Sequence, residues 1–112
     1  MNQTRKMRES EQNLIIFLLK KLNLNLADYP INEYVEEYEG GKMGSISMGN
    51  PDVSPYDGDL IQANYVDSDG IGVVITLTKD TNNQLLDLDF WKVDFSKLLV
   101  YPKPENLMFI EN

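Results

Sequence analysis

The segment from residue 85 to residue 95 constrains the fold of this chain more than any other stretch. Its first half alternates strictly, with apolar side chains on one face of an extended strand and carboxylates on the other: Leu86, Leu88 and Phe90 against Asp87 and Asp89. After Phe90 the alternation reverses, and the apolar positions become Trp91, Val93 and Phe95. A strand in constant register cannot turn both apolar sets toward one core. The pattern therefore predicts a β-bulge near Phe90 and Trp91, with Trp91 mostly buried.

Apolar residues at helical spacing predict one α-helix over residues 8–22. Ser10 is placed to cap its first turn. One broad apolar stripe faces the core: Leu14, Ile15, Leu18, Leu19 and Leu22. Ile16 and Phe17 fall outside this stripe, so they need a second cover, either from the tail of this chain or from another chain.

The rest of the chain is predicted to form antiparallel strands joined by short connections. Residues 33–39 and 43–48 predict a hairpin around Gly40-Gly41, because glycines readily adopt the positive φ of a tight turn. Three further strands form a meander over residues 60–66, 71–78 and 85–95, the first two joined at the turn Asp67-Ser68-Asp69-Gly70. Residues 1–7, the loops 23–33 and 49–59 and the proline-containing tail 97–112 are predicted to lie outside the sheet.

These elements predict a single α+β domain over residues 1–112. The N-terminal helix packs on an antiparallel sheet of about five strands, built from a hairpin plus a meander.

Charge is distributed unevenly along the chain, whose net charge is −8. Residues 1–21 hold five Lys or Arg and two Glu, a balance of +3, whereas the remaining residues hold five bases and sixteen acids, a balance of −11. A surface this acidic repels phosphate, which argues against nucleic-acid binding and is compatible with a basic protein partner. Solubility alone would also account for this charge.

The chain contains neither cysteine nor histidine. Disulfides, zinc–thiolate sites, cysteine nucleophiles and serine–histidine triads are therefore excluded, and the lack of cysteine fits a reducing compartment. The longest apolar run, residues 14–19, is far shorter than the roughly 20 residues that span a membrane. No signal peptide is evident, so we expect a cytoplasmic protein without membrane association.

Carboxylate pairs remain as motifs with chemical potential. Asp-x-Asp occurs three times, as Asp57/Asp59, Asp67/Asp69 and Asp87/Asp89. A calcium-binding EF-hand loop through Asp67 would need a glutamate where Thr76 stands, so Asp67 and Asp69 are better explained as turn residues. Asp87 and Asp89 would lie about 6.8 Å apart on a strand, which suits neither a metal clamp nor a retaining glycosidase pair. The sequence thus assigns no catalytic, cofactor-binding or metal-binding residue, and an enzyme is not expected.

Four motifs occur in an order that resembles a family of small acidic bacterial proteins of unknown function. They are the helical segment 14–19, the glycine-rich segment 40–45, the pair Asp69-Gly70 and the strand 88–96. The resemblance spans residues 5–98, and its most specific part is Asp-Phe-Trp-Lys-Val-Asp-Phe at residues 89–95. It implies no activity. In size and acidity such proteins are similar to the immunity proteins of bacterial toxin systems, which implies neutralisation of a basic protein partner.

Three functions are compatible with these features. The leading one is a non-enzymatic, immunity-like domain that binds a basic protein partner. Its candidate contact residues are Glu36, Glu37, Asp87 and Asp89. The second is a structural subunit of a homo-oligomer, with Ile16 and Phe17 at the self-interface. The third is a small enzyme that uses carboxylates with a divalent metal.

Overall fold

The computed structural model describes residues 3–38 and 42–109, and within them it contains one α-helix and six strands. In chain order the elements are β1 (Gln3–Lys6), α1 (Glu9–Lys21), β2 (Tyr34–Glu37), β3 (Ile46–Ser47), β4 (Tyr56–Val66), β5 (Gly72–Asp80), β6 (Leu85–Lys92) and the 3-10 turn η2 (Pro104–Asn106). The α+β class is confirmed, with six strands in place of about five and with strand β1 preceding the helix.

All six strands pair antiparallel in one sheet, in the order β1-β2-β3-β6-β5-β4. The predicted meander is β4-β5-β6, and β2 and β3 are the predicted hairpin strands, although the turn at Gly40-Gly41 lies outside the described residues. The predicted loop over residues 49–59 is shorter than expected, because β4 begins at Tyr56. Strand β3 is only two residues long, yet it connects β2 to β6.

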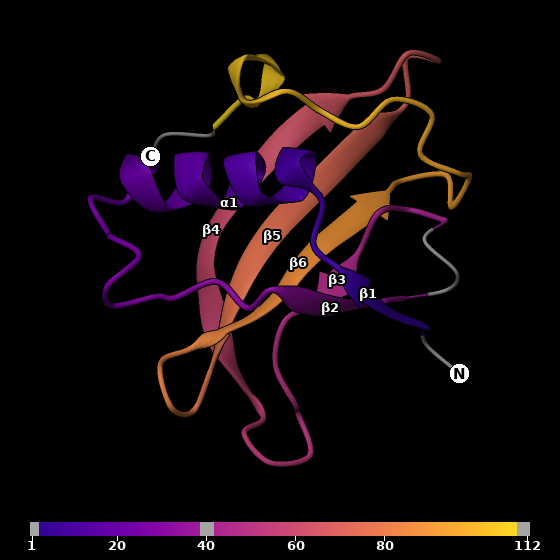
Figure 1. Ribbon diagram of the computed structural model, residues 1–112. Coiled ribbons are helices and arrows are strands. Elements are labelled where there is room, and N and C mark those ends of the chain that lie inside the picture. The colour runs from indigo at the N-terminus through magenta and orange to yellow at the C-terminus, as the bar shows by residue number, and fades with distance from the viewer. Residues whose placement is uncertain (1–2, 39–41, 110–112) are drawn as a thin grey trace.

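Helix α1 lies across one face of the sheet, and among the described residues no helix covers the opposite face (Figure 1). We call that opposite face the open face. The helix buries Leu14, Ile15, Leu18 and Leu19 in the core, as its apolar stripe predicts. The residue before its first turn is Arg8 and not Ser10, and the backbone N–H of Arg8 donates to Oε1 of Glu11 at 2.8 Å.

The N-terminal segment is part of the sheet, so the prediction that residues 1–7 lie outside it is wrong for residues 3–6. Arg5 of β1 explains the difference. Its Nη1 and Nη2 donate to the two carboxylate oxygens of the buried Glu11 at 2.8 and 2.6 Å, and its Nε lies 3.3 Å from Oε1 of Glu37 on β2. One guanidinium therefore joins β1, β2 and α1, an arrangement that the planar fork of arginine suits.

Strand β6 does not carry the predicted bulge at Phe90 and Trp91. Its register with β5 runs unbroken from the pair Leu77–Leu88 to the pair Val73–Lys92, and the irregularity lies nearer the start of β6, between the pairs Leu77–Leu88 and Lys79–Leu85. The alternation therefore continues past Phe90, and Lys92 takes the next core position while Trp91 turns to the open face.

This register reverses two expectations about burial. Lys92 is 0% exposed, although the sequence places it with the polar residues, and Trp91 is 47% exposed, although it was predicted to be mostly buried. Val93 and Phe95, beyond the end of β6, are exposed as well.

The buried ammonium of Lys92 is saturated with oxygen ligands. Its Nζ donates to Oδ2 of Asp67 at 2.8 Å, to Oδ2 of Asp69 at 2.7 Å and to the carbonyl of Lys97 at 2.9 Å. The two aspartates come from the predicted turn between β4 and β5, which is confirmed: the N–H of Gly70 donates to the carbonyl of Asp67, and Gly70 has a positive φ. The charge is tolerated inside the protein because it is paired and hydrogen-bonded.

Asp67 also anchors the chain that follows β6. The backbone N–H groups of Leu99 and Val100 donate to its two carboxylate oxygens at 2.7 and 3.0 Å. Burial alone would raise the pKa of Asp67, but the hydrogen bonds from Leu99 and Lys92 outweigh it and lower the pKa from 3.8 to about 2. Asp67 is therefore a structural residue, shared between the β4–β5 turn, β6 and the tail.

Replacing Lys92 with methionine should destabilise the protein strongly. The Lys92→Met variant keeps an unbranched apolar side chain, one atom shorter than lysine, but leaves Asp67 and Asp69 without their cation. Breaking a buried pair in this way should lower the melting temperature by on the order of 10–20 °C. The matched control is Lys79→Met on β5, whose partner Asp57 is exposed, so its melting temperature should change by only a few degrees. Thermal melts followed by circular dichroism would measure both, and equal shifts would contradict the assignment.

The stability of the fold should fall in acid in a way that depends on Asp67. Because its pKa is about 2 in the folded protein and 3.8 when unperturbed, the carboxylate stabilises the fold fully above pH 3.8 and loses that contribution as the pH falls toward 2. Urea melts across this range should show a steeper loss of unfolding free energy for the wild type than for Asp67→Asn. The exposed Asp57→Asn control should keep the wild-type slope, and a wild-type slope in Asp67→Asn would contradict the prediction.

Candidate functional site

The open face carries a hollow of about 590 Å³ where β6, β3 and the end of β2 meet. We call it the open-face hollow, and it is lined by Tyr38, Lys42, Met43, Ser45, Asp87, Asp89, Phe90, Trp91 and Phe95. Asp87, Asp89 and Trp91 reach it because they alternate along β6 with residues that face the core. The strand alternation that sets the register of β6 thus also builds this site.

Two carboxylates, Asp87 and Asp89, line the hollow along β6. Oδ1 of Asp87 accepts a hydrogen bond from the hydroxyl of Tyr38 at 2.8 Å, and Oδ1 of Asp89 accepts one from Oγ of Ser45 at 3.2 Å. Burial raises the pKa of Asp87, and the hydrogen bond from Tyr38 offsets only part of that shift. Asp87 is half-buried and Asp89 is exposed, so Asp89 is the more accessible anion.

Ser45 fixes the hollow to the backbone of β6. Its Oγ accepts the backbone N–H of Phe90 at 2.8 Å, and the chain reaches this position through Gly44, whose φ is +94°. A Cβ atom at Gly44 would also come within 3.2 Å of Cδ2 of Leu98, a tight contact. Glycine is therefore required immediately before the serine.

Three carboxylates on this face form no ion pair with a described residue. The ion pairs between described side chains use the carboxylates of Glu11, Glu33, Glu37, Asp57, Asp67 and Asp69. None of them involves Glu36, Asp87 or Asp89. Lys92 follows Trp91 in the chain, but its side chain lies on the opposite face of the strand, where its ammonium binds Asp67 and Asp69.

Exposed aromatic side chains flank the carboxylates. The rings of Trp91 and Phe95 are 6.4 Å apart between centroids, and Phe95 is 64% exposed. The backbone of Phe95 has φ +64°, a left-handed conformation that disfavours bulky side chains. The other described non-glycine residues with positive φ are Asn23 and Asn83, and asparagine tolerates this region. An exposed aromatic side chain at such a position is unfavourable for folding and suggests a role in binding.

The acidic candidates of β2 separate onto two faces. Glu36 is exposed and sits directly across from Ser47, which in turn is paired with Asp87, so it lies on the open face beside the hollow. Glu37 points to the other face and pairs with Arg5. The structure therefore brings Glu36, Asp87 and Asp89 together on one face and removes Glu37 from the group.

The two helix candidates for a self-interface have different surroundings. The ring of Phe17 lies 6.3 Å from that of Phe109, so the tail of this chain covers it, and the ammonium of Lys21 lies 4.9 Å from the Phe109 ring. Ile16 is half-buried and lines a second, smaller hollow of about 320 Å³ with Leu19, Lys20, Leu24, Asn25 and Leu26.

Two further observations concern metals and membranes. Across residues 3–38 and 42–109, no three acidic side chains lie close enough together to hold a metal ion. In the same described part of the chain, no helix is long and apolar enough to cross a membrane.

The sequence placed Asp87 and Asp89 on one strand face, and the structure agrees. The sequence interpretation missed the exposed aromatic pair Trp91 and Phe95, because it treated Lys92 as an exposed polar residue and Trp91 as a buried one. One signal in the sequence was available: in a strand without a bulge, Leu88, Phe90 and Lys92 face the same side. Lys92 would then be buried, and a buried lysine needs an acidic partner.

Phe95→Asn should leave the fold as stable as before or slightly more stable. Asparagine tolerates the left-handed backbone better than phenylalanine does, which should stabilise the fold by roughly 1 kcal/mol. Loss of the exposed contact with Trp91 should destabilise it by about half that amount. Urea melts would measure the unfolding free energy. A loss above about 1 kcal/mol would show that Phe95 is present for stability.

Comparison with known proteins identifies a family for this chain but no individual relative. No curated protein matches the chain, and no solved structure matches it. One family does match, over residues 4–102, a range that includes α1, strands β2 to β6 and every residue of the open-face hollow. The chain belongs to this family, the domain of unknown function DUF6984.

Proposed function

We propose that this protein is a non-enzymatic binding domain whose open face docks a basic protein partner. The observation that supports this most is the open-face hollow, where Asp87 and Asp89, with Glu36 beside them, form no ion pair with a described residue. Carboxylates that no internal cation neutralises attract a partner of opposite charge and speed its encounter.

The character of the hollow also supports protein binding. Protein interfaces are enriched in exposed aromatic side chains at their centre, with polar residues around them. Trp91 and Phe95 provide such a centre, and the carboxylates and Tyr38 provide the polar surroundings. The net charge of −8 acts over a longer range in the same direction.

The proposal includes an immunity-like role in a bacterial cytoplasm. A small acidic domain neutralises a basic protein when it covers the basic surface on which that protein acts. The resemblance to small acidic bacterial proteins and the lack of cysteine support this setting.

A capped oligolysine peptide is a direct probe of the acidic face. It should bind the wild-type protein at low salt and lose about tenfold in affinity at physiological ionic strength, where charges are screened over about 8 Å. Asp89→Lys should weaken binding at least tenfold, because it places a like charge in the hollow. Isothermal titration calorimetry at two salt concentrations would measure these changes.

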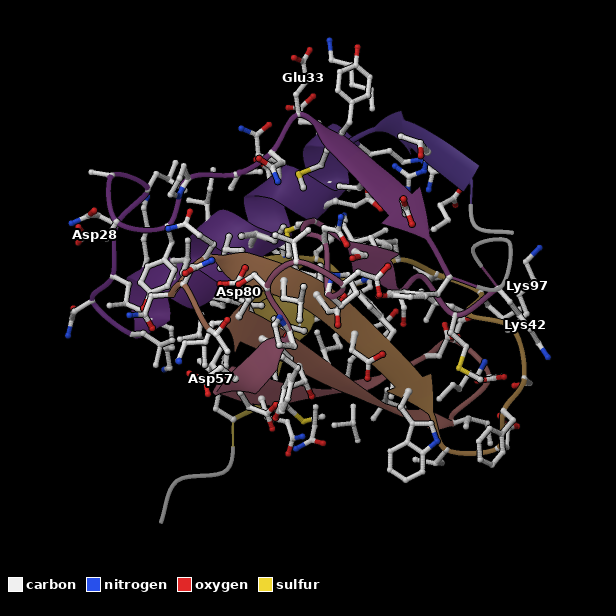
Figure 2. All side chains as sticks on the ribbon, turned by 90° about the horizontal axis from the view of Figure 1, so that it is seen from below. Asp28, Glu33, Lys42, Asp57, Asp80 and Lys97 are labelled. Carbon is white, nitrogen blue, oxygen red and sulfur yellow. The ribbon has the colours of Figure 1, made fainter. Side chains whose placement is uncertain are left out.

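The control for charge is Asp28→Lys, which changes the net charge by the same amount. Asp28 is exposed and lies at the opposite end of the molecule from Lys42, which lines the hollow (Figure 2). Its affinity for oligolysine should stay within about threefold of the wild type. Equal losses in the two variants would show that only net charge matters, and no binding at low salt would overturn the proposed function.

A further inference from the structure

We propose that the open-face hollow is an arginine site, in which one guanidinium of the partner stacks on Trp91 and bonds to Asp89. This inference rests on the proposed function and specifies its anchor. A basic surface could dock on scattered carboxylates without any such site, so the inference can fail alone.

The spacing of the two residues supports a single cation between them. Trp91 and Asp89 are two positions apart on the same face of β6, a separation of about 6.8 Å along the strand. A cation interacts with an indole ring when it lies within about 6 Å of the ring centroid. One planar guanidinium can therefore cover the ring while its edge reaches the carboxylate.

The neighbouring groups leave Asp89 free for this role. Asp87 is half-buried and accepts the hydroxyl of Tyr38, whereas Asp89 is exposed and accepts only the longer bond from Ser45 among the described side chains. The groups on both sides of Asp89 are hydroxyls, from Ser45 just before β3 and from Thr76, which is paired with Asp89 on β5. Neither is a cation that would neutralise the carboxylate.

Arginine fits this site better than lysine. Its guanidinium is flat, weakly hydrated and able to make two parallel hydrogen bonds to a carboxylate, whereas an ammonium is a strongly hydrated point charge. Trp91 and Phe95 together offer flat apolar surface that favours the less hydrated cation. The hollow also has a cation of its own in Lys42, near Lys97 at one end of the molecule, so the carboxylates along β6 are the attractive part (Figure 2).

Two capped peptides of equal length and charge, oligoarginine and oligolysine, test the arginine site. We expect oligoarginine to bind the wild type about fivefold more tightly or better, and to change the fluorescence of Trp91, the only tryptophan of the chain. Trp91→Leu should remove this preference by weakening oligoarginine to the level of oligolysine. Calorimetry provides the affinities for both proteins.

Matched variants and a neutral peptide complete the experiment. Val93→Leu changes another exposed apolar residue near the end of β6 that does not line the hollow, and it should keep the preference for arginine. An oligocitrulline peptide keeps the shape of arginine without its charge and should not bind.

The outcomes separate the inference from the proposed function. Equal affinities for the two cationic peptides, or a preference that survives in Trp91→Leu, would overturn the arginine site while the acidic docking face stands. Absence of binding by both cationic peptides at low salt would overturn both. Binding of oligocitrulline as tight as that of oligoarginine would show that charge is not involved and would also overturn both.

Discussion

The ammonium of Lys92 lies inside the protein between three oxygen atoms, and much of the fold depends on that arrangement. A buried charge of this kind is tolerated in a core only when its partners are in place. A shift in the register of β6 would separate the ammonium from Asp67 and Asp69 and leave buried charges unpaired. Asp67 also binds the backbone of Leu99 and Val100. One cluster therefore fixes the β4–β5 turn, the end of β6 and the start of the tail relative to one another.

The same cluster determines the character of the open face. Strand alternation allows Lys92 to neutralise only one side of β6, and it serves the core side. Asp87 and Asp89 lie on the other side without an ion pair to a described residue, next to an indole ring that the register has turned outward. The register of β6 thus has two effects: it buries a stabilising ion-pair cluster on one face of the strand, and it places carboxylates and an aromatic ring on the other face.

Local patterns predicted the elements well and the long-range pairs poorly. The apolar stripe of α1, the meander and the turn Asp67-Ser68-Asp69-Gly70 follow from short-range spacing, and the structure confirms them. The burial of Lys92 depends on aspartates more than twenty residues away, and strand β1 depends on Arg5 reaching Glu11 and Glu37. Local spacing does not show which acidic residues pair with Lys92 and Arg5 in the folded chain. The sequence therefore favoured a bulge at Trp91 and an N-terminal segment outside the sheet.

The shortness of β3 has a mechanical consequence. Two residue pairs on each side of this strand join the half-sheet β1-β2 to the three long strands β4 to β6, so the joint is the narrowest hydrogen-bonded connection in the sheet. The open-face hollow spans that joint, with Tyr38 on one side and Asp87 on the other. A ligand bound in the hollow would contact both sides of this joint and stiffen it. Ligand binding would then slow the opening of the backbone hydrogen bonds of β3, without any change in the shape of the sheet.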